Sequence, residues 1–149
     1  MTGSVTDYER IEFTVYGKPE PQGSKRLGRH GTRFVVLDDN DRTLKPWRRL
    51  VANHARVAAR THAAAPFDGP LCLIVDFTMP RPPSAPRRRV WPTVKPDLSK
   101  LIRAVEDSLT EGGVWVDDAR VVLITSSKRY VGDPLALSRP GVIIGVHPL

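Results

Sequence analysis

The chain has 149 residues and a single cysteine, Cys72, which lies in the apolar stretch LCLIV. One cysteine cannot form an intramolecular disulfide, and it cannot supply a cysteine-rich zinc site. The first residues, MTGSVTDYER, are polar and include acids, which is unlike a secretory signal. Together these absences predict a cytoplasmic protein.

Long apolar stretches and nucleotide-binding motifs are also missing. No stretch approaches the roughly 20 apolar residues that span a bilayer, and neither a P-loop nor a dinucleotide fingerprint occurs. The four histidines show no metal-ligand spacing, and Ser24 lacks the G-x-S-x-G context of a nucleophilic serine. The sequence therefore gives no support to a membrane span, a nucleotide-binding fold, a zinc site or a serine hydrolase.

Positive charge is in excess, with 23 Lys and Arg against 16 Asp and Glu and a formal net charge of +7. This balance favours a polyanionic partner, either nucleic acid or an anionic membrane surface. Because no long basic amphipathic helix is present to lie on a membrane, nucleic acid is the favoured partner.

The hydrophobic pattern predicts a single α/β domain over residues 1–149, with a mixed β-sheet and two main helices. Residues 17–33 and 80–96 are rich in Gly or Pro and are predicted as long loops, and DDNDR (38–42) is predicted as a turn. The apolar stretch 70–79 is expected to be a central strand. Strands are predicted at 11–17, 34–37, 70–79, 119–131 and 140–149, and helices at 44–61 and 98–109.

Apolar residues at helical spacing define the expected buried face of each helix. In 44–61 these are Leu50, Val51, Val57 and Ala58, and in 98–109 they are Leu98, Leu101, Ile102, Val105 and Leu109. Two glycines, 112 and 113, are expected to end the second helix. The side of that helix opposite its stripe carries Asp97, Lys100, Ala104, Asp107 and Glu111.

The two predicted loops are strongly basic. Residues 80–96, PRPPSAPRRRVWPTVKP, contain six prolines and five bases but no acid, which is typical of a stiff extended segment. Trp91 in this loop suits either stacking on a base or anchoring the loop to the body. Residues expected to contact DNA phosphates are Lys25, Arg26, Arg29 and Arg33 in the first loop, and Arg87, Arg88, Arg89 and Lys95 in the second.

Residues 97–118 form an acidic island in this basic chain, with six acids against two bases, Lys100 and Arg103. Asp97 and Asp107 are about 15 Å apart along a straight helix, so they cannot both hold one ion. The chain turns back through GGVWVDD, so Asp117 and Asp118 can return to either end of the helix. Carboxylates gathered in this way repel one another unless a cation offsets them, and they suit Mg²⁺, which prefers oxygen ligands.

Each acid also has a simpler interpretation. Asp97 suits the N-cap of the second helix, Asp107 suits a solvated surface acid, and Asp117–Asp118 suits a turn before a strand. The pattern alone leaves these alternatives open.

The stretch KPDLSKLIRAVEDSLT (95–110), followed by GGVWVDDARVV (112–122), resembles the RusA family of Holliday junction resolvases, which are common in phages and prophages. The family pattern has K/R-x-D-L-D-N, a basic residue three positions beyond the Asn, a later helix acid, and an aromatic residue before Asp-Asp and a valine strand. The N-terminal YGKPEPQGSKR (16–26) also resembles a segment of many phage members.

This resemblance implies a RusA-like fold and an endonuclease that depends on Mg²⁺, with Mn²⁺ as a substitute. It implies a homodimer that resolves four-way DNA junctions in recombination and repair. Asp97 matches the first catalytic aspartate, Asp118 matches the second residue of the Asp-Asp pair, and Asp117 stands beside it; these three are the implied metal ligands. Arg103 falls at the family's catalytic lysine and Asp107 at the later helix acid, while Lys100 or Arg103 would offset charge on the phosphate.

The chain departs from the family pattern at two positions. Ser99 stands where the second aspartate of D-L-D belongs, and Lys100 replaces the Asn. Serine supplies no charge, so one expected carboxylate is missing. Two alternatives therefore stay open: a non-catalytic nucleic-acid-binding protein on the same fold, and a less selective nuclease acting on forks or flaps.

Overall fold

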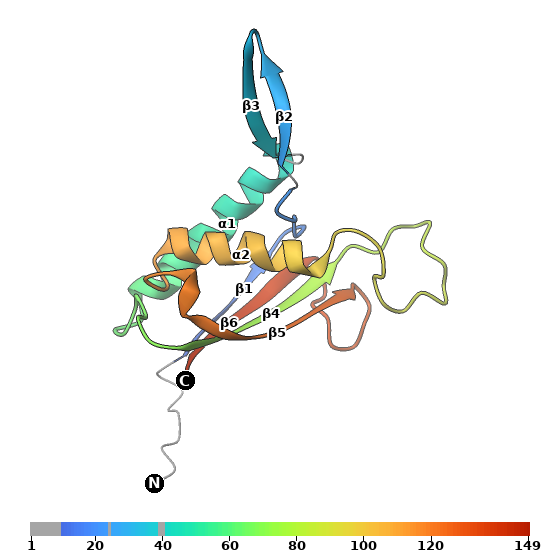
Figure 1. Cartoon of the computed structure of the whole chain (residues 1–149). Helices are drawn as coiled ribbons and strands as arrows, with labels where there is room; N and C mark the ends of the chain where they lie inside the picture. The colour runs from blue at the N-terminus through green and yellow to red at the C-terminus, as the bar shows by residue number, and fades with distance from the viewer. Residues whose placement is uncertain (1–9, 24, 39–40) are drawn as a thin grey trace.

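The computed structural model describes residues 10–23, 25–38 and 41–149. Two helices lie over the same face of a four-stranded sheet, and a separate two-stranded hairpin projects from this body (Figure 1). In chain order the elements are β1 (Ile11–Tyr16), β2 (Lys25–His30), β3 (Arg33–Asp38), α1 (Asp41–Arg60), β4 (Leu71–Met79), α2 (Leu98–Gly112), a 3₁₀ turn (Asp118–Arg120), β5 (Val121–Tyr130) and β6 (Gly141–Pro148).

The main sheet is mixed, as the sequence predicts. Its strand order is β1-β6-β4-β5, so β4 is an inner strand and β5 lies at an edge. β4 pairs antiparallel with β6 and parallel with β5, and β1 pairs antiparallel with β6. The predicted α/β fold with two main helices is therefore confirmed. No helix within the described ranges is both long and apolar enough to cross a membrane.

The core lies between the sheet and the two helices. Alternate residues of β4, Leu71, Leu73, Val75 and Phe77, are buried, because side chains alternate between the two faces of a strand. The intervening residues of β4 up to Asp76 are only half-buried, on the face that carries neither α1 nor α2 (Figure 1).

Helix α1 begins earlier than predicted, and its buried face agrees with the predicted one only in part. It starts at Asp41, in the predicted DDNDR turn, whose residues 39 and 40 lie outside the described ranges. Leu50 and Val57 are 37% and 63% exposed, although the pattern placed them on the buried face. Val51 is buried as predicted, and Ala58 packs partly buried against the core. The buried residues that the pattern missed are Leu44, Trp47, Ala52 and Ala55. Small alanines carry a weak hydrophobic signal, but they allow a neighbouring helix to approach closely.

Helix α2 supplies that neighbouring surface. It extends to Gly112, and Gly113 follows in the left-handed conformation with φ of 78°, which glycine adopts without strain. Gly112 itself is buried against Ala55 of α1. Ala104 is also buried, so the apolar surface of α2 is wider than the predicted stripe.

The predicted loop at 17–33 is wrong in its second half. β2 pairs antiparallel with β3, and the register places His30 opposite Arg33, so Gly31 and Thr32 form a two-residue turn. Gly31 has φ of 64°, as tight hairpin turns require. KRLGRH has no apolar alternation, so its strand character depends on β3. The predicted strand at 34–37 lies within β3 and is confirmed.

We expect Gly112→Val to destabilise the protein. A Cβ at Gly112 would lie 2.7 Å from the Cβ of Ala55 and 3.0 Å from the carbonyl oxygen of Ala52, so the helices would have to separate. Overpacking of this kind costs about 1–3 kcal/mol, which urea denaturation measures as a lower free energy of unfolding.

Gly69→Val is the matched control, because a Cβ at Gly69 meets no atom of the described residues within 4 Å. We expect it to change the free energy of unfolding by less than about 0.5 kcal/mol. Equal stabilities for the two variants would contradict the close packing of α1 on α2.

Candidate active site

Asp97 occupies the N-cap position of α2, but its carboxylate does not act as the cap. Its backbone carbonyl accepts hydrogen bonds from the amides of Lys100 and Leu101, both at 3.1 Å. Its side chain makes no capping hydrogen bond to any described residue and is exposed. The interpretation of Asp97 as a simple N-cap therefore holds for the backbone only, and the carboxylate is available to a ligand.

Lys128 fixes the chain just before Asp97. This residue lies on β5, and its Nζ donates hydrogen bonds to the carbonyl oxygens of Val94 at 2.8 Å and Pro96 at 2.7 Å. Burial lowers the pKa of Lys128, and the negative charge of Asp97 acts in the opposite direction. Sequence reasoning missed Lys128, since a single lysine in a predicted strand carries no signal of its own.

A cavity with a volume of about 390 Å³ lies beside Asp97. The amide of Gln22 donates a hydrogen bond to the carbonyl of Lys100 at 3.0 Å and so ties the segment before the hairpin to the helix. The charged lining residues are Lys18, Glu20, Lys95, Asp97 and Lys100.

A second group of charges lies further along α2. The guanidinium of Arg103 contacts Asp118 at 3.3 Å and Asp107, one turn further along the helix, at 3.5 Å. Arg103 is itself more than half exposed. Three of the predicted site residues are thus brought together by contacts between their side chains.

The chain returns to this group through a buried turn. The backbone of Phe67 exchanges hydrogen bonds with Val114 and Val116, both at 2.9 Å. Trp115 is buried between them, and its Nε1 donates to Thr110 Oγ1 at 2.8 Å. This turn delivers the Asp117–Asp118 pair to the side of α2 rather than to its start.

Asp117 and Asp118 are adjacent, and their pKa values shift in opposite directions. The amide of Ala119 donates to Asp117 Oδ1 at 2.9 Å, and this bond, with a further one from Asp118, lowers the pKa of Asp117. The pKa of Asp118 is raised, first by its hydrogen bond with Asp117, then by burial and by repulsion from nearby acids, while Arg103 opposes the shift.

Glu106 is a fourth acid in this group and was not among the predicted site residues. Burial raises its pKa, and repulsion from Asp118 adds to the effect. The sequence gave no reason to select Glu106 over the neighbouring Asp107. Its proximity to Asp118 depends on where the chain returns after α2.

The predicted site residues therefore form two groups at different positions along α2. Arg103, Asp107, Asp117 and Asp118 lie together, whereas Asp97 and Lys100 line the cavity at the start of the helix. In the described ranges, no three His, Cys, Asp or Glu side chains converge as metal ligands do. The donor set is still one that suits Mg²⁺, which commonly uses one or two carboxylates together with waters and substrate phosphates.

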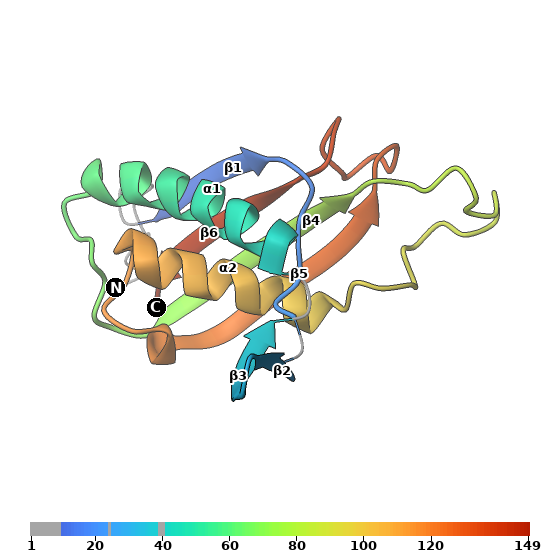
Figure 2. The same ribbon diagram turned by 90° about the horizontal axis from the view of Figure 1, so that it is seen from above.

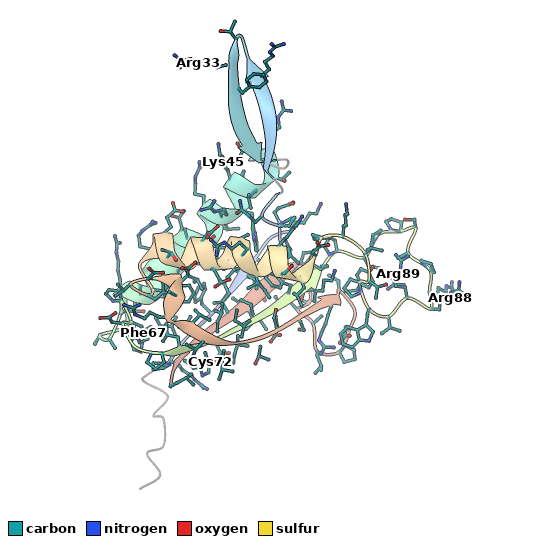
Figure 3. All side chains as sticks on the ribbon, viewed as in Figure 1. Arg33, Lys45, Phe67, Cys72, Arg88 and Arg89 are labelled. Atoms are coloured by element: carbon teal, nitrogen blue, oxygen red, sulfur yellow. The ribbon has the colours of Figure 1, made fainter. Side chains whose placement is uncertain are left out.

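The predicted DNA-contacting residues lie on two projections. Arg33 is at the tip of the β2–β3 hairpin, and Arg88 is at the outer end of the Pro-rich loop 80–96 (Figure 3). The hairpin base and this loop lie on either side of the start of α2 in both views (Figures 1 and 2). Arg29, Arg33, Arg87, Arg88 and Lys95 are exposed and Arg89 is half-buried, while the side chains of Lys25 and Arg26 lie outside the described structure.

The Pro-rich loop is braced by arginines rather than by secondary structure. Arg81 donates to the carbonyls of Pro86 and Arg89, both at 2.7 Å. The guanidinium of Arg129 lies 4.7 Å from the ring centre of Trp91, whose side chain is nevertheless 50% exposed. Trp91 therefore contacts the body of the protein and still presents ring surface to solvent.

Comparison with known proteins gives the family. The model of the family "Endodeoxyribonuclease RusA" matches residues 16–139. A protein of Bacillus subtilis (strain 168), described as uncharacterized protein YqaN, is 30% identical over 135 residues, which cover 83% of this chain and 90% of that protein. The chain belongs to the RusA family of endodeoxyribonucleases, which are hydrolases that act on DNA. The resemblance found in the sequence is confirmed.

We expect Glu106→Gln to stabilise the metal-free protein at neutral pH. A carboxyl with a raised pKa in the folded state favours folding while it is protonated, and this contribution is lost as the pH rises through the folded-state pKa. The variant should therefore melt above wild type at pH 7 but equal it near pH 4, below the ordinary glutamate pKa of about 4.3.

Thermal melts in EDTA at both pH values measure this difference. Glu111→Gln removes the same charge from an exposed position of α2 and serves as the control. A Glu106→Gln variant less stable than wild type at pH 7 would show that Glu106 is not crowded by the acids around it.

Proposed function

We propose that the protein is a Mg²⁺-dependent endonuclease that resolves four-way DNA junctions by paired hydrolysis of phosphodiester bonds, in recombination and repair in the cytoplasm. The observation that carries the proposal is the cluster of Arg103 with Asp107 and Asp118, where the hydrogen bond with Asp117 and burial raise the pKa of Asp118. Membership of a family of DNA endonucleases supports the same reaction.

The metal ligands proposed are Asp117, Asp118 and Asp97. The first two are adjacent, and the carboxylate of Asp97 is not used as a helix cap. When bound, Mg²⁺ or Mn²⁺ would supply charge neutralisation for the phosphodiester and an activated water. Ser99 adds no charge to this set, so the site has one carboxylate fewer than the family pattern.

The other side chains of the cluster would act on the phosphate. Arg103 presents several N–H donors and is more than half exposed, so it can contact a phosphate oxygen while Asp107 orients it. Lys100 lies one turn nearer the start of α2 and offers a second positive charge there. These groups stabilise negative charge that develops on the phosphate during attack.

The basic projections would hold the junction arms. Phosphate contacts position DNA without reading its sequence, which suits an enzyme that selects a branched shape. The hairpin and the Pro-rich loop diverge from the start of α2 (Figure 2), so they can contact two different arms.

Paired cuts require two active sites, and a homodimer related by a twofold axis provides them. The edge strand β5 is the surface that we assign to the second copy. Val122, Leu123 and Ile124 are 61%, 56% and 45% exposed on it, and within the described residues its outer edge has no strand partner. Exposed apolar edge strands readily pair with another chain, and Asp118 precedes β5 in each copy.

Cleavage of a synthetic four-way junction tests the proposed reaction. With Mg²⁺, the wild type should give paired nicks, and Asp118→Asn should cut at least about 100-fold more slowly while binding the junction normally. Glu111→Gln is the matched control, since it removes a carboxylate from α2 outside the Arg103 cluster.

Two outcomes would contradict the proposal. Binding without cleavage in Mg²⁺ or Mn²⁺ would favour a non-catalytic nucleic-acid-binding protein. Equal competition by linear duplex, or equal cutting of forks and flaps, would remove the preference for four-way junctions.

The dimer surface is tested separately by Leu123→Lys. A lysine on the edge of β5 should repel its symmetry mate and leave the exposed protomer surface otherwise unchanged. Sedimentation velocity should show a dimer for wild type, a monomer for Leu123→Lys, and a dimer for the control Leu135→Lys, which changes a leucine 74% exposed in the loop before β6. A Leu123→Lys variant that stays dimeric would exclude this edge.

A further inference from the structure

A smaller cavity near the start of α2 contains polar groups that the proposed reaction does not use. Its volume is about 190 Å³, and residues of the Pro-rich loop and of β5 line it. Three lysines, Lys18, Lys95 and Lys128, line it together with Tyr130, and none of the described lining residues is acidic. The remaining walls are apolar: Met79, Pro80, Pro82, Pro92, Val94 and Pro96.

One lining residue, Tyr130, carries an unusual hydroxyl. Tyr130 is only 3% exposed, and its Oη has no hydrogen-bond partner among the described residues. Nearly all buried polar groups in folded proteins have a partner. The ring is covered by the guanidinium of Arg81, 4.9 Å from the ring centre. A ligand oxygen bound at the cavity that reaches Oη would supply the missing partner.

The ammonium of Lys128 is fixed at the same place. It carries three N–H donors, and two of them point to the carbonyls of Val94 and Pro96. Because these bonds hold the ammonium, its charge is already positioned for a ligand, and little side-chain entropy is lost on binding.

The smaller cavity adjoins the cavity of Asp97. Both are lined by Lys18, Lys95 and Pro96. A DNA strand that passes Asp97 can therefore place a neighbouring phosphate among these lysines.

We propose that the smaller cavity binds a backbone phosphate of the DNA strand that is cut, next to the reacting phosphodiester; this inference rests on the proposed nuclease function. Phosphate oxygens accept hydrogen bonds, and the cavity offers the phenol of Tyr130 and the ammonium of Lys128 as donors. Lys18 and Lys95 add positive charge at the passage between the two cavities. Tyr130 positions the strand and takes no part in the chemical step.

Tyr130→Phe removes the hydroxyl and keeps the ring under Arg81. Junction binding is measured by fluorescence anisotropy with Ca²⁺ in place of Mg²⁺, and cleavage kinetics are measured with Mg²⁺. We expect binding to weaken about tenfold, as for a hydrogen bond to a charged group, and KM to rise to the same extent with kcat nearly unchanged. Tyr16→Phe is the matched control, because Tyr16 also lies under an arginine, 4.1 Å from Arg139, but does not line this cavity.

A second measurement locates the phosphate. Junctions are made with a single neutral methylphosphonate at each position around the cut. With wild type, one position beside the cut should weaken binding, and with Tyr130→Phe the same replacement should cost less than in wild type, because both changes remove the hydrogen bond of Tyr130 while the lysine contacts remain in the variant. Lys18→Met should lower the slope of log affinity against log salt by about one, which gives an independent variant.

The two proposals fail differently. Tyr130→Phe with unchanged affinity, KM and methylphosphonate profile would overturn the phosphate site, even if wild type resolves junctions normally. Conversely, the binding data support the phosphate site if the coupling appears in Ca²⁺, even when no cleavage occurs and the proposed reaction is wrong.

Discussion

The position of Asp118 depends on the buried turn that follows α2. Gly113 ends the helix in the left-handed conformation, Trp115 enters the core, and Phe67 fixes the backbone on both sides of it. The chain is thereby returned beside Arg103, about nine ångströms along the helix axis from Asp97. Without this turn, the acids after α2 would have no fixed relation to those on the helix. Packing of apolar groups thus determines the electrostatics of the site.

The main sheet and both helices could be predicted from the sequence, because their apolar residues recur with the period of a strand or a helix. β4 is the clearest case, since a continuous apolar stretch indicates an inner strand. The hairpin could not be predicted, because Lys25–His30 carries bases and glycine instead of an alternating pattern. The buried face of α1 was predicted only in part, for a related reason. Its contact with α2 depends on small residues, Ala52 and Ala55 against Gly112, whose hydrophobicity is too low to mark a face.

The sequence predicted most of the residues of the candidate site, but it did not predict which of them lie close together in space. Asp107, Asp118 and Arg103 come together, but Glu106 and Lys128 gain their importance only from the folded chain. Glu106 is distinguished from other surface acids by burial near Asp118, and Lys128 by the two carbonyls that it reaches. The sequence shows how far apart residues lie along α2, but the point at which the chain returns after α2 is a tertiary property. The joint binding of one ion by Asp97 and Asp118 stays a prediction for this reason.

The division of charge explains why a basic chain keeps an acidic island. Outside residues 97–118 the chain carries a net charge of +11, because the island itself carries −4. The hairpin and the Pro-rich loop place much of that positive charge on projections, away from the carboxylates of α2 (Figure 3). Positive charge spread evenly would neutralise the acids and leave no affinity for a cation. Acids spread evenly would repel DNA. Separating the two lets long-range attraction bring phosphate to the protein, while the short-range repulsion among Glu106, Asp117 and Asp118 is left for a cation to relieve.

The approach of a phosphodiester adds negative charge to that region, so DNA and cation are expected to bind cooperatively. That coupling follows from the charges alone, and it would make the cation a condition for bringing DNA close to the acids.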